Sequence, residues 1–344
     1  MKIFLDEFGI FLGRKKNRFL VKRAKGEKTE VLADDVESII FTTQGAAVSA
    51  SALNLAIKHM VQVVFAKYGG WPYAILMPTA MTGSVRARRE QFLAYNDERG
   101  FILARKFVIG KLANQASLLK LMAKNRKPTN AELAETLYKG GRAVDDIIIR
   151  INEEPASKID EKRQTLMNLE AEGARIYWDS IKQILPAELE FPGRQTRGAR
   201  DPFNAMLNIG YQTILFPEVW KAVSYAGLDP YAGYLHADRP GKPSLVLDLM
   251  EEFRQQIVDR TIIGLVTKNV IKPSEVLVAA SPEGQILNSE TVKTLLTSLQ
   301  ERLDTPVMFN GQRAPIKNLI HSQARRTVRF LLREAEYTPF YLGW

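Results

Sequence analysis

The spacing of apolar residues changes near residue 80, and this change limits the chain to an architecture with two different parts. Residues 1–80 contain short segments rich in β-branched and aromatic residues, separated by glycine or acidic turns, which predicts strands. These segments are KIFLDE, IFLGRKKNRFLVKRA, KTEVLA, VESIIFTT, VQVVFAK and WPYAILMP. The intervening SASALNLAIKHM predicts a helix whose N-cap is Ser49 or Ser51.

The later part of the chain shows apolar residues at spacings of three and four, which is typical of helices. Asp201 and Pro202 predict a helix start, and this helix should run to Ala226. Further helices are expected from Ser244 and over residues 316–336. The sequence therefore predicts an α+β chain with a small N-terminal β-sheet domain, a linker and a larger all-α C-terminal domain that carries the functional residues. Their expected bounds are residues 1–80, 81–90 and 91–344.

Charge and cysteine content limit the classes of function. The chain of 344 residues has a formal net charge of +10 and a pI of about 9.6, which favours an anionic partner. It contains no cysteine, which excludes disulfides, thiolate zinc sites and cysteine nucleophiles. Asp6 and Glu7 interrupt the apolar start that a signal peptide needs, and no apolar run reaches the ~20 residues of a membrane span. We expect a cytoplasmic protein without membrane contact.

A tract between residues 227 and 254 combines one histidine with several acids. His236 lies in a turn-rich loop, Asp248 follows twelve residues later, and Glu251 three residues after that. The helix from Ser244 would place Asp248 and Glu251 on one face with further polar residues, namely Glu252, Gln255 and Asp259. Such a stripe alone is usually a solvated surface. The histidine in the preceding loop favours a metal site instead.

Glu172 is a second candidate, 64 residues before His236. It lies on or at the edge of the apolar face of its helix, where a carboxylate is costly unless it is paired or binds a metal. An ion pair with Arg175 is the alternative. Carboxylates with one imidazole suit Mg²⁺ or Mn²⁺, which polarise phosphoryl oxygens. Zinc is a poorer match because the chain has no thiolates and only three histidines.

Basic residues occur in several clusters, which would contact phosphates without distinguishing base sequence. One cluster follows the predicted strands, one precedes Asp201, one flanks the histidine loop, and one has four-residue spacing in the last helix. The candidate DNA-binding residues are Arg86, Arg88, Arg89, Arg200, Arg239, Lys242, Arg325 and Arg329. Asn204, Asn208 and Tyr211 share a helix face, where they orient a ligand or satisfy polar groups in a packing seam.

Four segments in this order resemble the CRISPR-associated integrase of spacer acquisition, and the likeness covers essentially the whole chain. They are EAEGARIYW (170–178), DPFNAMLNIGYQTIL (201–215), GLDPYAGYLH (227–236) and PSLVLDLMEEFR (243–254). The resemblance implies a β-sheet N-terminal domain and a helical catalytic domain. It also implies a metal held by Glu172, His236 and Glu251, with Asp248 one turn earlier in the acidic patch.

The resemblance further implies a homodimer that joins a small ferredoxin-like partner, CRISPR-associated protein two. The 3′-hydroxyl of a short foreign DNA fragment would attack a phosphodiester at the edge of a CRISPR repeat, and water in its place would make the site an endonuclease.

A non-catalytic DNA-binding scaffold explains the charge but not the grouped histidine and acids. A hydrolase of small phosphoesters would leave the arginine clusters unused. The tail YTPFYLGW (337–344) contacts another subunit or packs on its own domain.

Overall fold

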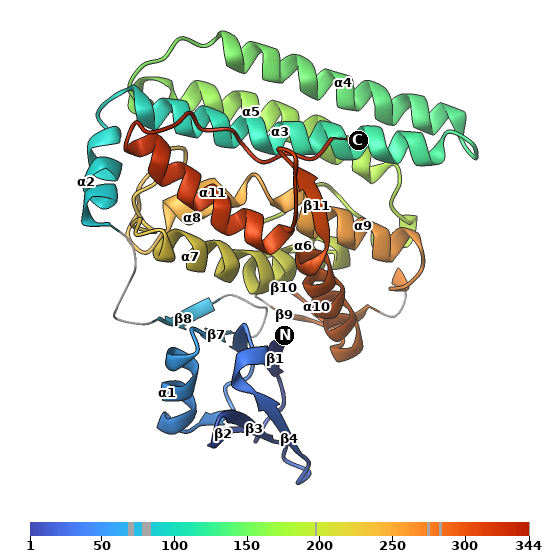
Figure 1. Cartoon of the computed structure of the whole chain (residues 1–344). Coiled ribbons are helices and arrows are strands. Elements are labelled where there is room, and N and C mark those ends of the chain that lie inside the picture. The colour runs from blue at the N-terminus through green and yellow to red at the C-terminus, as the bar shows by residue number, and fades with distance from the viewer. Residues whose placement is uncertain (68–71, 78–83, 197, 274–275, 282–283, 344) are drawn as a thin grey trace. The chain divides into compact units, whose positions relative to one another are not determined.

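The computed structural model describes residues 1–344 except 68–71, 78–83, 197, 274–275, 282–283 and 344. The chain divides into two units, Met1–Met81 and Thr82–Trp344. In the residues described, the first unit contains sheets and one α-helix and the second is mostly helical, so the α+β class is confirmed (Figure 1). Within the range predicted as a linker, residues 81–90, Ser84 caps a helix that begins at Val85.

The N-terminal unit contains two four-stranded sheets. In one sheet β1, β5 and β7 are parallel and β8 is antiparallel to β7; in the other β4, β3 and β2 form an antiparallel meander and β6 runs parallel to β2. Ser49 accepts a hydrogen bond from the Ala52 amide and so begins α1. The bounds are β1 (Lys2–Leu5), β2 (Phe11–Lys15), β3 (Arg18–Lys22), β4 (Lys28–Leu32), η1 (Ala33–Asp35), β5 (Ser38–Phe41), β6 (Ala47–Val48), α1 (Ala50–Lys58), β7 (Gln62–Ala66) and β8 (Pro72–Leu76).

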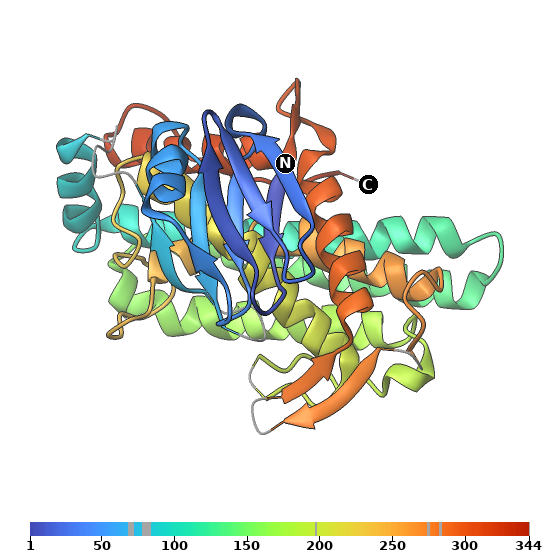
Figure 2. The same ribbon diagram turned by 90° about the horizontal axis from the view of Figure 1, so that it is seen from below.

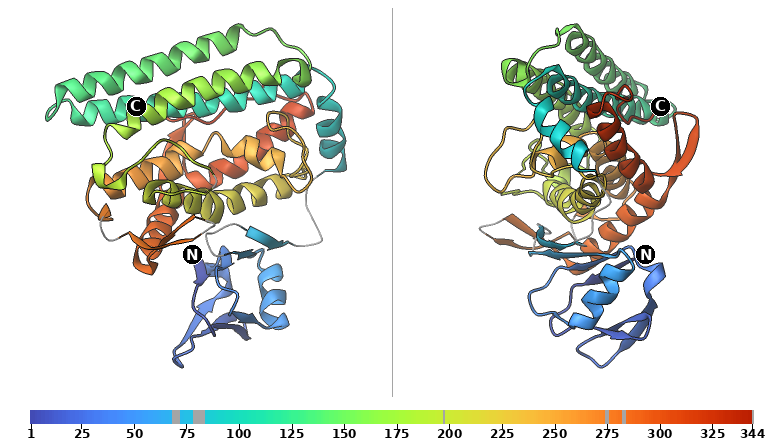
Figure 3. Two further views of the ribbon diagram at one scale, coloured as in Figure 1. Left: turned by 180° about the vertical axis from the view of Figure 1, so that it is seen from behind. Right: turned by 60° about the vertical axis from the view of Figure 1, so that its left-hand side comes forward.

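Three long helices of the second unit lie side by side, as the two views in Figure 3 and the contacts among them show. Gly173 makes their close approach possible, since a Cβ there would lie 2.5 Å from Leu112 Cδ2 of the neighbouring helix. The helices are α3 (Glu98–Arg126), α4 (Ala131–Glu153) and α5 (Ile159–Lys182), and α2 (Val85–Ala94) precedes them. This packing brings residues of α3 next to residues of α5, and both helices contribute side chains to the candidate site.

The remaining helices include two π-helical turns. The helix predicted from Asp201 is present but has a π-turn, η3, in its middle, and a second π-turn, η4, follows Glu251. The elements are η2 (Ala187–Leu189), α6 (Pro202–Ile209), η3 (Gly210–Leu215), α7 (Phe216–Tyr225), α8 (Ser244–Met250), η4 (Gln255–Asp259), α9 (Arg260–Thr267), α10 (Ser289–Asp304) and α11 (Ile316–Leu331). π-turns of this kind are frequent at functional sites.

Two hairpins interrupt the helical unit and were not predicted (Figure 2). They pair β9 (Leu277–Ser281) with β10 (Gly284–Leu287), and β11 (Pro306–Phe309) with β12 (Gln312–Pro315). Asn310 and Gly311 connect the second pair with positive φ angles of 50° and 75°. An Asn-Gly pair between short strands is a recognised hairpin signal, so this element was accessible from the sequence.

The C-terminal segment after α11 packs on its own unit rather than continuing the helix to residue 336 as predicted. Phe340 and Leu342 are buried. The Asn114 side chain of α3 donates to the Phe340 carbonyl and accepts from the Leu342 amide. Of the two alternatives for the tail, contact with another subunit or packing on its own domain, these contacts match the second. No helix in the described ranges is both long and apolar enough to span a bilayer.

Candidate metal centre

His236 is held by a buried carboxylate. Asp248 of α8 is fully buried, and its two oxygens accept the backbone amides of Tyr234, Leu235 and His236 at 2.6, 3.0 and 3.0 Å. The His236 Nδ1 atom lies 2.6 Å from Asp248 Oδ1. Metal-binding histidines usually donate their other ring N–H to such an oxygen. When Nδ1 donates here, Nε2 is left with its lone pair available to a ligand.

Gly233 allows the histidine loop to lie directly against α8. A Cβ at Gly233 would be 2.5 Å from the Ser244 carbonyl carbon and 2.8 Å from Asp248 Oδ2, which real side chains do not tolerate. The Gly233 amide donates to Ser244 Oγ at 2.9 Å. The segment GYLH therefore needs glycine at its first position so that the next three amides can converge on Asp248.

Glu251 is a buried carboxylate between two cations. Lys111 Nζ lies 2.7 Å from Glu251 Oε2, and Arg254 Nε lies 3.1 Å from Glu251 Oε1. Burial alone would raise the pKa of Glu251, but the charges of Arg254, Lys111 and His236 outweigh it and hold the pKa at about 2. Glu251 is therefore ionised at neutral pH, as a metal ligand must be.

Lys111 connects Glu251 to a glutamate that the sequence did not single out. Its Nζ lies 2.5 Å from Glu170 Oε1 of α5, so one ammonium joins Glu170 and Glu251. Burial would lower the pKa of Lys111, but Glu251 and Glu170 raise it to about 12. Two carboxylates from different helices thus converge on a single cation.

The structure does not bring Glu172 into this group. Its carboxylate is 42% exposed and pairs at 2.8 Å with Arg150 of α4 rather than with Arg175, the predicted alternative. Glu170 and Glu172 are two positions apart on α5, so they differ by about 200° around the helix axis. Because Glu170 contacts Lys111 of α3, Glu172 lies on another side of α5.

The acidic stripe after Ser244 is buried, so the alternative of a solvated helix surface is wrong. Glu252 accepts from Tyr337, Gln323 and the Phe340 amide at 2.7, 2.9 and 2.8 Å. Burial raises the pKa of Glu252 to about 7 despite these donors. Glu252 thus links the segment that carries Glu251 to the C-terminal segment.

Asp259, at the end of the stripe, belongs to a second buried network. It accepts from Tyr177 at 2.9 Å and also from the Tyr211 hydroxyl. Asn204 and Asn208 accept from Arg194 at 2.9 and 2.7 Å. The Arg194 guanidinium lies 5.2 Å from the centre of the Tyr211 ring. Of the two predicted roles for Asn204, Asn208 and Tyr211, these contacts match the packing seam.

The predicted DNA-binding residues lie on several elements of the helical unit. Arg86, Arg88 and Arg89 are exposed on α2, and Arg325 and Arg329 are exposed on α11. Arg200 and Arg239 are exposed on loops, whereas Lys242 is half-buried and burial lowers its pKa. The exposed side chains are accessible to a large anion, and the half-buried Lys242 is accessible in part.

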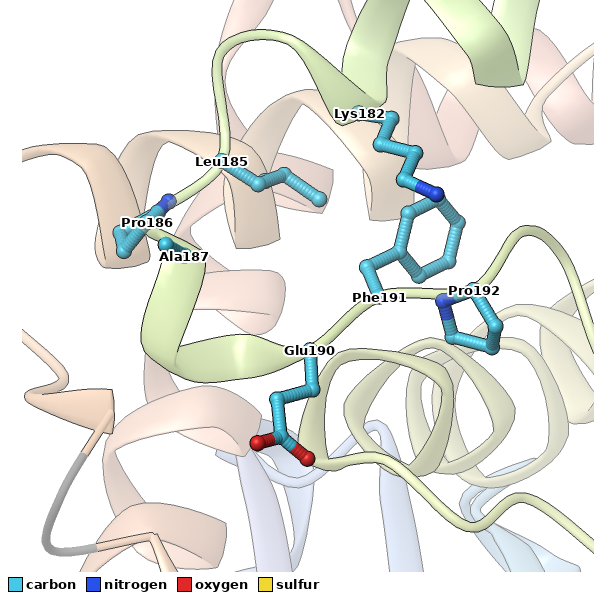
Figure 4. Close-up of a pocket in the computed structure, with 7 residues that line it drawn as sticks. All are labelled: Lys182, Leu185, Pro186, Ala187, Glu190, Phe191 and Pro192. Carbon is cyan, nitrogen blue, oxygen red and sulfur yellow. The ribbon is translucent and has the colours of Figure 1, made fainter.

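Chemically, Glu170, Glu251 and His236 Nε2 form a donor set suited to a hard divalent cation. Within the described residues, no three His, Cys, Asp or Glu side chains already stand in metal-ligand geometry. The chemical fit to a cation rests instead on the two carboxylates, which share the Lys111 ammonium. A cavity of about 480 Å³ is lined by none of these residues (Figure 4). Its lining is Lys182, Leu185, Pro186, Ala187, Glu190, Phe191 and Pro192.

Sequence reasoning missed Glu170, Lys111 and Arg254. Glu170 stands in the same EAEG segment as Glu172, and the helical period alone favours neither. Lys111 interrupts the apolar run FVIGKLA, and a lone charge within such a run is a signal of a paired buried group. Arg254 is three residues after Glu251, a spacing that favours contact on a helix.

The fold and the site together define a chain of two compact units, with carboxylates and an imidazole grouped in the helical unit. The chain belongs to the CRISPR associated protein Cas1 family, whose model matches residues 3–301. It is 38% identical over 352 residues to the CRISPR-associated endonuclease Cas1 1 of Archaeoglobus fulgidus, covering 100% of both chains. It is 32% identical to the CRISPR-associated endonuclease Cas1 of Korarchaeum cryptofilum, covering 99% of this chain and 98% of that one.

Solved structures share the fold at lower identity. A casposase bound to its integration product superposes with a TM-score of 0.83 at 22% identity, covering 98% of this chain and 92% of that chain. A Cas1 protein from Thermotoga maritima gives a TM-score of 0.77 at 22% identity, with 99% of both chains covered. A chain of a Cas6-RT-Cas1–Cas2 complex gives 0.78 at 17% identity, covering 99% of this chain and 36% of that chain.

Proposed function

We propose that this chain is a metal-dependent DNA endonuclease and integrase that inserts short foreign DNA fragments into a CRISPR array in the cytoplasm. Membership of the Cas1 family supports this, because the relatives in Archaeoglobus fulgidus and Korarchaeum cryptofilum are named endonucleases. The observation that carries the proposal is the convergence of Glu170 and Glu251 on one cation, together with the histidine loop that Asp248 holds against α8. A scaffold that only binds DNA has no use for buried carboxylates, which repel phosphate.

We assign Glu170, His236 and Glu251 as the residues that would hold Mg²⁺ or Mn²⁺. This replaces Glu172 with Glu170, because Glu172 pairs with Arg150 in solvent whereas Glu170 shares Lys111 with Glu251. Asp248 uses both oxygens on the histidine loop, so its role is to orient His236 rather than to bind the metal. The bound metal would stabilise negative charge on the reacting phosphate.

The chain's own residues prepare that chemistry. Asp248 fixes the His236 ring, and Arg254 and Lys111 keep Glu251 ionised. In strand transfer the 3′-hydroxyl oxygen of the fragment forms a bond to phosphorus while the bond to the 3′-oxygen of the repeat strand breaks. One phosphodiester is exchanged for another, so no external energy source is required. Water as the nucleophile would give hydrolysis.

We propose double-stranded DNA, a second copy of this chain and a Cas2-type protein as partners. The net charge of +10 and the exposed arginines support DNA binding through phosphate contacts. The casposase in the structure of similar fold is bound to an integration product, and another such chain belongs to a complex with Cas2. Arg86, Arg88, Arg89, Arg200, Arg239, Lys242, Arg325 and Arg329 are the residues we propose for the DNA surface.

Strand transfer tests this function. Purified protein, with and without a Cas2-type partner, is mixed with a labelled short duplex and a supercoiled plasmid that carries a CRISPR repeat. We expect label to join the plasmid in Mn²⁺ or Mg²⁺ and not in EDTA, and His236→Ala to abolish joining while DNA binding is retained. Tight DNA binding without joining or cleavage under every condition would instead support the non-catalytic scaffold.

A further inference from the structure

Lys111 lies where a cation between the two site carboxylates would be placed. Its ammonium is 2.5 Å from Glu170 Oε1 and 2.7 Å from Glu251 Oε2. The lysine side chain is 14% exposed, and those of Glu170 and Glu251 are 21% and 7% exposed. Water therefore screens this group weakly, and the two carboxylates depend on a nearby positive charge.

The charges of the group balance without any metal. Lys111 and Arg254 contribute two positive charges, and Glu170 and Glu251 contribute two negative charges. Arg254 contacts Oε1 of Glu251, so only Lys111 faces both glutamates. A divalent cation bound by these carboxylates adds two further positive charges, and Lys111 would then repel it at short range.

We propose that Lys111 is a built-in counter-ion that holds Glu170 and Glu251 together before metal binds and competes with the divalent cation for them. This rests on the proposed metal site. The ammonium leaves the carboxylates when the cation enters, since both cannot occupy the space between the same oxygens. Lys111 thus gives the metal-free protein a formed site at the cost of metal affinity.

Another lysine of α3 offers a matched control. Lys120 pairs with Asp145 of α4, and its side chain is 12% exposed, so it resembles Lys111 in burial and in having a carboxylate partner. Asp145 belongs to no part of the proposed metal site. Lys120→Met therefore reports the general effect of losing a buried ion pair on this helix.

The experiment measures Mn²⁺ binding to the full-length protein by calorimetry, and thermal unfolding in EDTA. We expect Lys111→Met to unfold at a lower temperature than wild type in EDTA, because Glu170 loses its cation and Glu251 keeps only Arg254. We expect the Mn²⁺ affinity of Lys111→Met to rise about tenfold or more, because no ammonium then competes with Mn²⁺ for Glu170 and Glu251. Lys120→Met should also lose thermal stability but keep the Mn²⁺ affinity of wild type.

If wild type binds Mn²⁺ and a folded Lys111→Met protein binds it equally or more weakly, the proposed role of Lys111 is overturned. The proposed metal site is not affected by that result. If Lys111→Met does not fold, Lys111→Gln supplies neutral amide donors to the same carboxylates and should likewise bind Mn²⁺ more tightly. Failure of wild type and all variants to bind Mn²⁺ would overturn the metal site and this role of Lys111 together.

Discussion

Asp248 illustrates how one buried residue prepares the site. Its carboxylate receives three backbone amides and the His236 ring, so it fixes both the loop and the imidazole. A buried carboxylate with four donors is satisfied without a metal. In the proposed function, Asp248 therefore contributes by orienting His236 rather than by binding the metal.

Asp248→Asn should lower Mn²⁺ affinity by about 10- to 100-fold, the usual effect of losing a residue that orients a metal-binding histidine. Calorimetry on the purified proteins measures this change. Asp238→Asn is the control, because Asp238 is an exposed acid of the same loop that accepts only a 3.2 Å hydrogen bond from Ser244. Equal Mn²⁺ affinities for wild type and Asp248→Asn would contradict the positioning role.

At the scale of elements, the two π-turns η3 and η4 pack against each other. A Cβ at Gly210 of η3 would lie 2.7 Å from Val258 Cγ1 of η4, so glycine allows their contact. Tyr211 of η3 donates to Asp259 of η4 across this contact. Burial raises the pKa of Asp259 to about 6, although the hydrogen bonds from Tyr211 and Tyr177 oppose the rise.

This carboxyl makes stability depend on pH. The folded protein holds the Asp259 proton more tightly than the unfolded chain, whose pKa is near 3.8. The free energy of unfolding should therefore fall as pH rises from about 4 to about 6, by about 3 kcal/mol for this group, and stay level above. Urea unfolding of wild type and Asp259→Asn across this range measures the difference, and a pH-independent difference would contradict the assignment.

Helix positions could be predicted from the sequence because apolar spacing reports them directly, whereas the π-turns could not. A single extra residue in one turn still leaves apolar residues three or four positions apart, so the spacing in the sequence does not reveal the π-turn. Asp248 and His236 could be paired in advance because a short loop joins them. Lys111 could not be placed with Glu251, because the packing of α3 against the later helices brings them together and no local pattern encodes it.

The choice between Glu170 and Glu172 shows the same limit. Both lie in EAEGARIYW. The prediction chose Glu172 because it directly precedes Gly173. Only the packing of α5 against α3 and α4 distinguishes the two glutamates. Glu170 contacts Lys111 of α3, whereas Glu172 contacts Arg150 of α4. The N-terminal strands were predicted more fully, because turns and β-branched residues mark each one.

For the whole molecule, the net charge of +10 predicts DNA binding that weakens with salt. Replacing Arg325 and Arg329 of α11 by alanine should weaken binding to any duplex and reduce the slope of log affinity against log salt by about 2. Fluorescence anisotropy at several salt concentrations measures the slope. Lys124→Ala with Lys127→Ala removes the same charge from the end of α3 and is the control; equal slopes for the two double variants would contradict a DNA surface on α11.

The most direct test of the central claim compares Glu170→Gln with Glu172→Gln in metal-dependent strand transfer. The two variants change neighbouring glutamates of one helix by the same chemistry, so they differ only in the side of α5 affected. We expect Glu170→Gln to lose more than about 100-fold in rate, beyond the effect of an orienting residue, and Glu172→Gln to keep nearly all activity. Loss of activity in Glu172→Gln with full activity in Glu170→Gln would contradict the site built on Lys111, Glu170 and Glu251.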